Sequence, residues 1–455
     1  MFKKMLIANR GEIAVRIIRA ARELGITTVA VYSEADKEAL HTNLADEAIC
    51  IGPAKSTDSY LNMNSVLSAA IVSGAEAIHP GFGFLSENAK FATMCEEMNI
   101  KFIGPAGSIM EKMGDKINAR AEMIKADVPV IPGSSGEVVT AEEALEIADS
   151  VGYPVMLKAS AGGGGKGIRK VNKKEDLVPA FEAASQEALA AFGNGAMYIE
   201  KVIYPARHIE VQILGDSFGH IVHLGERDCS LQRNNQKVLE ESPSVAIGPT
   251  LRQKMGDAAV RAAQAVAYES AGTIEFLLDE KSGQFFFMEM NTRVQVEHPV
   301  TEFVTGIDII KEQIKIASGE ALSYKQEEIT IEGHAIECRI NAENPDFNFA
   351  PSPGKITDLY LPGGGVGLRV DSAVYPGYTI PPYYDSMIAK VIVHGENRFD
   401  ALMKMQRALY ELEIEGVVTN TDFQLDLISD SHVIAGDYDT SFLMETFLPN
   451  YHKKD

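Results

Sequence analysis

The chain has 455 residues, which predicts two or three packed units rather than one small core. Its hydrophobic content of 45% and charged content of 23% are typical of globular proteins and argue against disorder. The net charge of -22 argues against binding to nucleic acid or anionic membranes, although a local basic cluster can still hold a small anion because salt screens charges beyond about 8 Å.

The first unit consists of alternating predicted strands and helices. Residues 5–8 form an apolar strand that polar residues at 9–12 end too early for a secretory signal. Apolar residues at helical spacing follow, and Gly25 ends that helix before a strand at 27–32. A later strand at 77–78 runs into a turn whose glycines do not complete a Gly-x-Gly-x-x-Gly fingerprint. These elements predict a doubly wound α/β unit of the Rossmann type.

The pattern changes after residue 114 and again near residue 333. The second unit begins with a helix at 115–125 and a turn-rich stretch at 128–133, followed by a helix at 140–151 and a strand at 154–158. The third unit begins with a strand at 334–340 and ends in a helical stretch. The sequence therefore predicts an α/β chain of three units.

A glycine-rich loop follows the strand that ends in Lys158. It contains Gly162, Gly163, Gly164, Gly165, Lys166 and Gly167. Glycines allow backbone amides to approach phosphate oxygens, and the two lysines supply positive charge. The loop lacks the Ser or Thr of a Walker A motif, and a flexible surface hairpin is the alternative. The position of Lys158 at the strand end favours a mobile phosphate-binding loop.

Residues 272–290 predict an antiparallel hairpin with its turn at 279–283. Counting outward from the turn places Glu275 opposite Glu289. Opposed carboxylates in adjacent strands repel each other, with Cβ atoms about 4.5–5.5 Å apart. A divalent cation between them would remove the repulsion, so the hairpin predicts a Mg²⁺ site completed by substrate phosphates.

Polar residues continue beyond Glu289 at every second position. They are Asn291, Arg293, Gln295 and Glu297. If the strand continues, these side chains share one face and the intervening Met and Val side chains share the other. A solvated sheet face is the alternative, but such faces are usually rich in Lys and Thr, and Asn is depleted in strands. We interpret the row as a reaction surface.

A second predicted strand carries alternating polar residues at His208, Glu210 and Gln212. Residues 226–230 and the pair Gln236 and Lys237 follow after a hairpin. A lone histidine is more often structural than catalytic, so only the polar residues around His208 support a functional role for this strand.

The four cysteines are widely spaced and form no Cys-x-x-Cys pair: Cys50, Cys95, Cys229 and Cys338. This spacing favours a reducing cytoplasm over a disulfide framework and argues against a metal-thiolate site. No apolar run approaches the roughly 20 residues of a membrane span. We therefore expect a soluble cytoplasmic protein.

The sequence resembles the biotin carboxylase component of acetyl-CoA carboxylase, an ATP-grasp enzyme, over essentially its whole length. The resemblance rests on IANRGEIA at 7–14, HPGFGFLSEN at 79–88, KASAGGGGKG at 158–167, ERDCS at 226–230, EMNTRVQVEHP at 289–299 and PPYYDSM at 381–387. It implies a Rossmann-like N-terminal domain over 1–114, an ATP-grasp domain over 115–332 with a mobile lid at about 131–204, and a C-terminal α+β domain over 333–455.

The resemblance also implies roles for individual residues. ATP would be held by Lys116, Lys158, Gly163, Gly164, Gly165, Lys166, Gly167, Glu200, Lys201, Ile203, His208, Gln232, Lys237, Glu275 and Glu289. Mg²⁺ or Mn²⁺ would be bound by Glu275 and Glu289 with Asn291. Bicarbonate would be bound by Lys237, Arg293, Gln295 and Val296. Glu297 would take its proton, and Arg339 would stabilise the biotin enolate, so Glu297, Arg293, Arg339 and Lys237 are the implied catalytic residues.

The implied reaction forms carboxyphosphate from ATP and bicarbonate and then carboxylates biotin, the first half-reaction of acetyl-CoA carboxylase in fatty acid synthesis. The chain ends at Asp455 without a carrier domain, so we expect biotin to arrive on a biotin carboxyl carrier protein, with separate carboxyltransferase subunits. Arg19 and Glu23 match positions of the family's homodimer interface, although an exposed pair one helical turn apart is the alternative.

Three positions need separate interpretation. Asn235 stands where the family often has His, which would alter a nucleotide contact, and Phe82 stands where Tyr is frequent. Lys404 lies in a Met-Lys-Met tripeptide like that of biotin carrier domains, but apolar residues at helical spacing around it predict a solvated helix residue.

Two other functions remain open from the sequence. The chain could be the biotin carboxylase portion of a larger carboxylase that acts on pyruvate or an acyl-CoA. It could also be a nucleotide-binding regulator that has lost catalysis, although the presence of Glu275, Glu289, Arg293, Glu297 and Arg339 argues against this.

Overall fold

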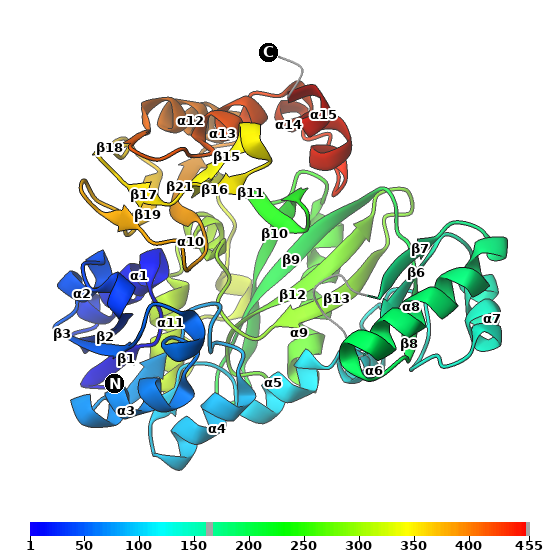
Figure 1. Ribbon diagram of the computed structural model, residues 1–455, viewed down its shortest axis with the longest axis horizontal. Coiled ribbons are helices and arrows are strands. Elements are labelled where there is room, and N and C mark those ends of the chain that lie inside the picture. The colour runs from blue at the N-terminus through cyan, green and yellow to red at the C-terminus, as the bar shows by residue number, and fades with distance from the viewer. Residues whose placement is uncertain (161–166, 452–455) are drawn as a thin grey trace.

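The N-terminal unit is a parallel α/β sheet, as predicted. The computed structural model describes residues 1–160 and 167–451. Its first sheet has the strand order β3-β2-β1-β4-β5, and all pairs are parallel (Figure 1). The elements are β1 (Lys4–Ile7), α1 (Gly11–Glu23), β2 (Thr27–Ser33), α2 (Leu40–Leu44), β3 (Glu47–Gly52), α3 (Met63–Ser73), β4 (Ala77–His79), α4 (Ala89–Glu97) and β5 (Lys101–Phe102).

Helix α1 packs on this sheet through its apolar stripe. Ile13 and Ile17 are buried, and they share a core with β1 and with α11 (Ile309–Ala317). The helix ends as predicted near Gly25, which has a φ of 75° that favours glycine. Glu23, in the last turn, pairs with Lys311 at 2.5 Å. This contact differs from the pair with Arg19 that was the alternative to a homodimer interface.

A small unit projects from the right of the molecule in Figure 1. Its three strands are antiparallel in the order β7-β6-β8, and the inner sides of α7 and α8 form a separate apolar core with them. Its elements are α7 (Ala141–Val151), β6 (Val155–Ala159), β7 (Ile168–Val171), α8 (Leu177–Phe192) and β8 (Met197–Lys201), preceded by α5 (Gly107–Gly114) and α6 (Lys116–Lys125). Helices α6 and α7 begin with side-chain caps from Asp115 and Thr140. The predicted lid lies in this part of the chain, and its mobility remains a prediction.

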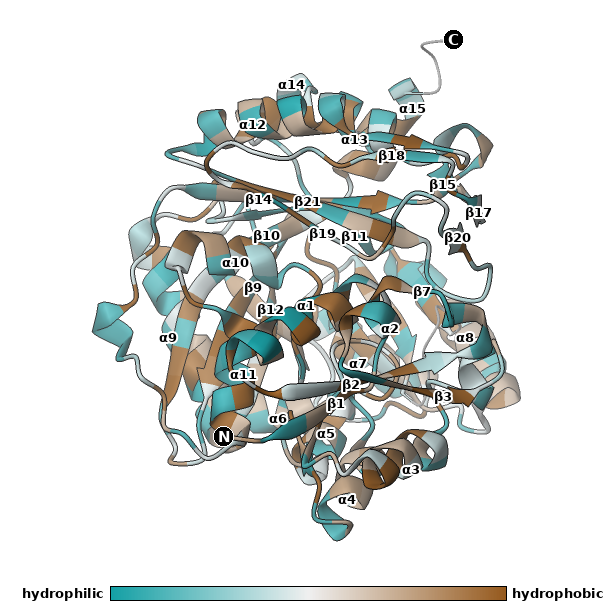
Figure 2. Ribbon diagram, turned by 90° about the vertical axis from the view of Figure 1, so that its left-hand side faces the viewer, coloured by the Kyte–Doolittle hydropathy of each residue, from teal (hydrophilic) through white to brown (hydrophobic). Residues whose placement is uncertain are grey.

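One large antiparallel sheet forms the centre of the molecule, in the order β13-β12-β9-β10-β11-β14-β21-β19. Its strands are β9 (Ala206–Gly215), β10 (Ile221–Arg233), β11 (Gln236–Ser242), β12 (Ser270–Asp279), β13 (Phe285–Asn291), β14 (His334–Asn341), β19 (Leu368–Ser372) and β21 (Met387–Gly395). Apolar residues of β9 and β12 pack under α9 (Pro249–Ala265), as the brown bands in Figure 2 illustrate. Because β11 pairs with β14, hydrogen bonding continues across the predicted boundary between residues 332 and 333.

The C-terminal helices cover one face of β14 and β21. They are α12 (Arg398–Glu411), α13 (Thr421–Ile428), α14 (Ser431–Ala435) and α15 (Leu448–Tyr451), and they share a large apolar core with those strands. Short strands complete this end: β15 (Glu343–Asn344), β16 (Ala350–Pro351), β17 (Gly354–Lys355), β18 (Asp358–Tyr360), β20 (Thr379–Ile380) and β22 (Glu413–Glu415). Lys404 lies on α12, as predicted, and pairs with Asp400 at 2.9 Å. Among the described residues, no helix has the length and apolar character needed to cross a membrane.

The prediction that the strand continues through residue 297 is wrong. Strand β13 ends at Asn291, and residues 292–297 form an irregular segment that leads into α10 (His298–Thr305). The backbone N–H of Thr292 donates to the carboxylate of Glu87 at 3.0 Å instead of to a neighbouring strand. The period-two alternation therefore does not decide which of these side chains share a face.

A tight hairpin between β10 and β11 explains the presence of Asn235. Asn234 and Asn235 have φ values of 50° and 64°, and the residues that flank them, Arg233 and Gln236, are register partners. A two-residue turn of this kind requires positive φ at both positions, which asparagine tolerates better than most residues. Asn235 thus has a backbone role in addition to lining the cavity described next.

Candidate active site

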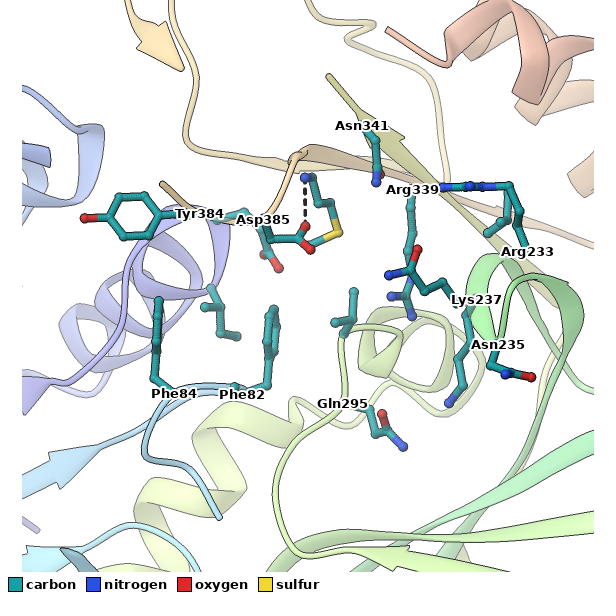
Figure 3. A pocket seen from close by; sticks show the side chains of 18 of the residues that line it. Phe82, Phe84, Arg233, Asn235, Lys237, Gln295, Arg339, Asn341, Tyr384 and Asp385 are labelled. Atoms are coloured by element: carbon teal, nitrogen blue, oxygen red, sulfur yellow. Dashed lines mark hydrogen bonds between the residues drawn. The ribbon is translucent and has the colours of Figure 1, made fainter. Parts of the chain in front are cut away.

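A cavity of about 760 Å³ opens between the N-terminal unit, the large sheet and the C-terminal part of the chain. Phe82 and Phe84 form one side, and Lys237, Gln295 and Arg339 lie across from them (Figure 3). Tyr383, Tyr384, Asp385 and Met387, which belong to one of the motifs identified in the sequence, close a third side. Segments that are remote in sequence therefore converge on one cavity.

Lys237 lies at the centre of a cluster of carboxylates beside this cavity. Its Nζ atom is 2.6 Å from Glu210 on β9, 3.1 Å from Glu275 on β12 and 2.6 Å from Glu297 in the segment before α10. Burial by itself would lower the pKa of Lys237, but these negative charges raise it well above its usual value. Lys237 is therefore a permanent cation that holds three separate elements together.

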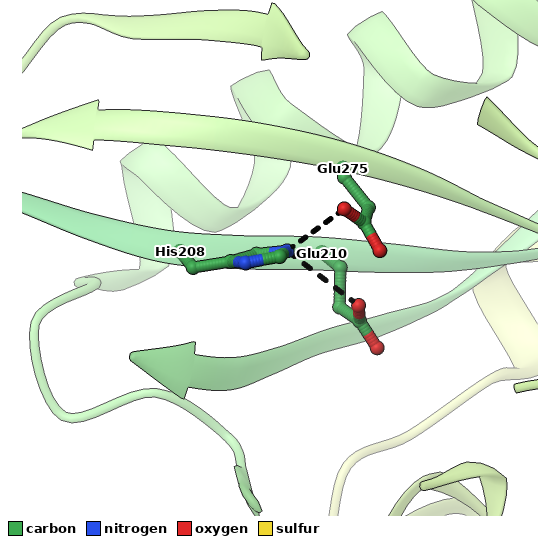
Figure 4. A group of neighbouring side chains, drawn as sticks. All are labelled: His208, Glu210 and Glu275. Carbon is green, nitrogen blue, oxygen red and sulfur yellow. Dashed lines mark ion pairs between the residues drawn. The ribbon is translucent and has the colours of Figure 1, made fainter. Parts of the chain in front are cut away.

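His208 contacts the same cluster from β9 (Figure 4). Its Nε2 atom is 3.1 Å from Glu275 and 3.8 Å from Glu210. These three side chains are close enough to hold a metal ion. Glu210, however, is already neutralised by Lys237 and by the buried Arg227, each at 2.6 Å. The arrangement is therefore an ion-pair network, and His208 and Lys237 of this network line the cavity.

In the hairpin of β12 and β13, Glu275 pairs with Glu289 as predicted, but the pairing includes a register shift between Glu275 and Phe276 that was not predicted. Both residues line the cavity, and Asn291 donates its side-chain amide to Glu275 at 2.9 Å. Desolvation in the cavity, followed by the charge of Glu275, raises the pKa of Glu289 above its usual value. The two carboxylates repel each other, and together with the amide of Asn291 they offer oxygen ligands that suit a hard divalent cation.

The irregular segment 292–297 brings three predicted bicarbonate residues to the cavity. Arg293, Gln295 and Val296 all line it, although Val296 was placed on the opposite face by the strand prediction. Gln295 donates to Glu275 at 3.0 Å, and Arg293 donates to Asn291 at 3.0 Å and to Glu87 at 2.9 Å. These contacts hold the side chains of Arg293 and Gln295 in place without a regular strand.

Glu297 is fully buried directly behind two cations of the cavity. It accepts from Lys237 at 2.6 Å and from Arg339 at 3.0 Å. Burial by itself would raise the pKa of Glu297, but the charges of Lys237, Arg339 and Arg227 hold it well below its usual value. Glu297 is therefore ionised, the form that can accept a proton.

The remaining predicted ATP residues that the structure describes do not line this cavity. Among the described residues, the cavity lining does not include Lys116, Lys158, Glu200, Lys201, Ile203 or Gln232. Lys158 and Glu200 pair with each other at 2.5 Å in the small projecting unit, and Lys201 donates to the carbonyls of Gly152 and Tyr153 at 2.8 and 2.9 Å. Gln232 contacts the ring of His208 at 2.7 Å. Gly163, Gly164, Gly165 and Lys166 lie outside the described residues, while Gly167 has a φ of 68° at the start of β7.

Sequence reasoning assigned no role to Glu210, Arg227 and Glu240, three buried residues that hold the cluster. Arg227 bonds Glu210, and Glu240 accepts from Arg339 at 2.6 Å. The alternation of polar residues on β9 singled out Glu210, and Arg227 lies in the motif at 226–230. Nothing in the local sequence distinguishes Glu240 from a solvated strand residue, because its partner is 99 positions away.

Comparison with known proteins gives consistent matches over nearly the whole chain. The N-terminal domain model of biotin carboxylase matches residues 1–110, the ATP-binding domain model of the carbamoyl-phosphate synthase L chain matches 115–325, and the C-terminal domain model of biotin carboxylase matches 337–445. Biotin carboxylase 1 of Bacillus subtilis is 60% identical over 98% of this chain and 99% of its own length. A pyruvate carboxylase subunit from Methanothermobacter thermautotrophicus is 54% identical over 98% of this chain and 90% of its own.

The solved structures agree with these matches. The biotin carboxylase domain dimer of 2-oxoglutarate carboxylase from Hydrogenobacter thermophilus, in complex with MgADP, ADP and bicarbonate, superposes with a TM-score of 0.90 at 52% identity and covers 98% of both chains. The three domains, the cavity and these matches lead to one conclusion. The chain belongs to the biotin carboxylase family, ATP-grasp ligases that carboxylate biotin with the use of ATP.

Proposed function

We propose that this chain is the biotin carboxylase subunit of an acetyl-CoA carboxylase and carries out the first step of fatty acid synthesis. The observation that carries the proposal is the cluster in which Lys237 joins Glu297 to Glu275 beside the cavity. Lys237, the proposed anion-binding cation, directly contacts both Glu297, the proposed proton acceptor, and Glu275, the candidate metal ligand, and these contacts support the proposal. The 60% identity to a full-length biotin carboxylase supports it.

In this reading bicarbonate binds against Lys237, Arg293, Gln295 and Val296, which line the cavity together. Glu297 accepts the bicarbonate proton, and the resulting oxyanion attacks the γ-phosphorus of ATP to give carboxyphosphate and ADP. Mg²⁺ held by Glu275, Glu289 and Asn291 would neutralise charge on the phosphates. The permanent cations Lys237 and Arg293 stabilise the negative charge that develops on the transferred group.

Biotin is carboxylated in the second step. Carboxyphosphate separates into CO₂ and phosphate, and the phosphate takes the proton from the ureido nitrogen of biotin. Arg339, which lines the cavity, stabilises the enolate oxygen while the nitrogen attacks CO₂. The remaining ATP contacts that the sequence predicts, including Lys116, Lys158 and the loop at 163–167, belong to the same proposal.

The proposed partners follow from this chemistry. Biotin arrives on a carrier protein, carboxyltransferase subunits use the product, and two copies of this chain form a dimer, as in the biotin carboxylase domain from Hydrogenobacter thermophilus. A cytoplasmic location suits the four free cysteines. The biotin carboxylase subunit of a pyruvate carboxylase is a second candidate, because one component of such an enzyme is 54% identical to this chain.

The test is an assay of ADP release by the purified chain with Mg-ATP, bicarbonate and free biotin, each omitted in turn. We expect ADP release to require bicarbonate and to rise with biotin. ADP release that ignores both additions would contradict the proposal and favour a nucleotide-binding regulator. Adding the carrier and carboxyltransferase encoded by the same genome, with acetyl-CoA or pyruvate as acceptor, distinguishes the two candidate functions.

Removal of one candidate metal ligand should change the metal requirement specifically. In Glu289→Gln we expect the Mg²⁺ concentration for half-maximal activity to rise about tenfold or more, because one of two opposed carboxylates is lost. Excess Mg²⁺ should restore much of the activity. The measurement is a Mg²⁺ titration at fixed ATP, with Glu280→Gln in the neighbouring turn as the matched control. An unchanged Mg²⁺ requirement would remove Glu289 from the metal site.

A further inference from the structure

Two glutamates with no place in the proposed reaction lie behind Arg339. Glu240 on β11 and Glu337 on β14 are register partners, and both are fully buried. Partners of this kind point to the same face of the sheet, with Cβ atoms about 4.5–5.5 Å apart. Neither residue lines the cavity. Two acidic side chains thus oppose each other in the interior of the sheet.

The groups around these two side chains supply too few hydrogen-bond donors for both to be carboxylates. Among the described residues, Oε2 of Glu240 and both carboxyl oxygens of Glu337 have no hydrogen-bond partner. An unpaired buried carboxylate is costly, and two like charges at this separation cannot both ionise readily. A proton held by one carboxyl group removes the repulsion and supplies the missing donor.

Arg339 determines which carboxyl group holds the proton. Its Nε and Nη2 atoms lie 2.6 and 2.5 Å from the same oxygen of Glu240, so Glu240 is the charged partner. The charged groups around Glu337 are Lys390 on β21, Glu240, Arg339 and Glu297. Burial raises the pKa of Glu337 well above its usual value despite Lys390. Burial and the negative charge of Glu297 raise the pKa of Glu240 to about 7, although Arg339 and Lys237 lower it.

We propose that Glu240 is a positioning residue that holds Arg339 in place for biotin, and that Glu337 behind it is a neutral carboxylic acid that donates its proton to Glu240. The role given to Arg339 rests on the proposed function. Glu337 itself takes no part in the reaction. The two carboxyl groups therefore carry one negative charge between them, matched to one guanidinium.

The arrangement matters when Glu297 changes charge. Arg339 is bound from two sides, by Glu240 at 2.6 Å and by Glu297 at 3.0 Å. When Glu297 accepts a proton from bicarbonate, its attraction for Arg339 weakens, while Glu240 keeps its charge. The guanidinium thus remains anchored by Nε, and its outer edge is free to meet the enolate oxygen of biotin.

A matched pair of substitutions tests both halves of the proposal. In Glu240→Gln we expect kcat/KM for biotin to fall about 10–100-fold through misplacement of Arg339, while the KM for ATP and for bicarbonate stay within about twofold. In Glu337→Gln we expect all three constants to match those of the wild type, because an amide replaces an equally neutral acid that also donates a hydrogen bond. An equal loss for ATP and biotin in Glu240→Gln would overturn the positioning role.

Direct detection of the proton is independent of catalysis. The infrared difference spectrum of the wild type minus Glu337→Gln at neutral pH should contain the carbonyl band of one protonated carboxyl group. A difference spectrum without that band would overturn the neutral state of Glu337. A wild type without biotin-dependent turnover would contradict the proposed function instead, and the infrared result would still stand.

The pH dependence of stability gives a third readout. The folded chain holds the Glu337 proton to a higher pH than the unfolded chain, in which glutamate titrates near about 4.3. Wild-type stability therefore loses a contribution as the pH rises above that value. We expect the denaturation midpoint of Glu337→Gln to exceed that of the wild type at pH 8 and to approach it at pH 5. Should Glu240→Gln fail to fold, Glu240→Asp, which keeps the charge but shortens the side chain, must show the same selective loss for biotin.

Discussion

Glu297→Gln should reduce bicarbonate-dependent turnover by about 10²–10⁴-fold while Mg-ATP affinity remains nearly unchanged. The amide has the size of the carboxylate but cannot accept the bicarbonate proton. Lys237 keeps two other carboxylate partners, Glu210 and Glu275, so its position beside the cavity should persist. The measurement combines steady-state ADP release with nucleotide affinity by calorimetric titration.

A buried glutamate elsewhere provides the matched control. Glu312 on α11 is 3% exposed and pairs with Lys315 at 2.7 Å, and it does not line the cavity. Glu312→Gln should therefore keep wild-type turnover, which separates loss of a base from loss of a buried charge. Raised Mg²⁺ should restore Glu289→Gln but not Glu297→Gln. Turnover of Glu297→Gln within threefold of the wild type would show that another group takes the proton.

Local sequence patterns were sufficient where partners are close along the chain. The hairpin of β12 and β13 followed from two apolar segments on either side of one turn, although its Glu275–Glu289 pair also needs a register shift beside Glu275 that counting residues does not give. The parallel sheet of the N-terminal unit followed from strands that alternate with helices. In both cases the periodicity of apolar residues carries the information.

The same patterns failed where contacts connect distant segments. Alternation suggested a strand through Glu297, but a hydrogen bond from Thr292 to Glu87, 205 positions away, draws the chain into an irregular segment. The pairing of β11 with β14 joins two units that composition separates. The roles of the buried residues Arg227 and Glu240 depend on Glu210 and Arg339, which lie on other strands. The local sequence does not reveal such contacts, because each strand by itself has an ordinary amphipathic pattern.

Lys237→Met should both abolish activity and destabilise the fold. Methionine keeps much of the side-chain volume but removes the positive charge that Glu210, Glu275 and Glu297 share. Breaking a buried ion pair by removing one partner costs about 3–5 kcal/mol, because the remaining charges lose their compensation. Lys315→Met on α11 is the control, since its partly exposed pair with Glu312 should be worth no more than about 1 kcal/mol.

The destabilisation by Lys237→Met should depend on pH. In the wild type the charge of Lys237 helps to hold the pKa values of Glu275 and Glu297 well below their usual range, so both carboxylates stabilise the fold above about pH 4.3 and lose that effect as the pH falls through their folded pKa values. In the variant both pKa values are higher than in the wild type, because the positive charge of Lys237 that lowers them is lost. Less of this stabilisation therefore remains at high pH. The difference between the two denaturation midpoints should therefore be larger at pH 8 than at pH 5. A difference that is equal at both pH values would mean that Lys237 acts through packing and not through its charge.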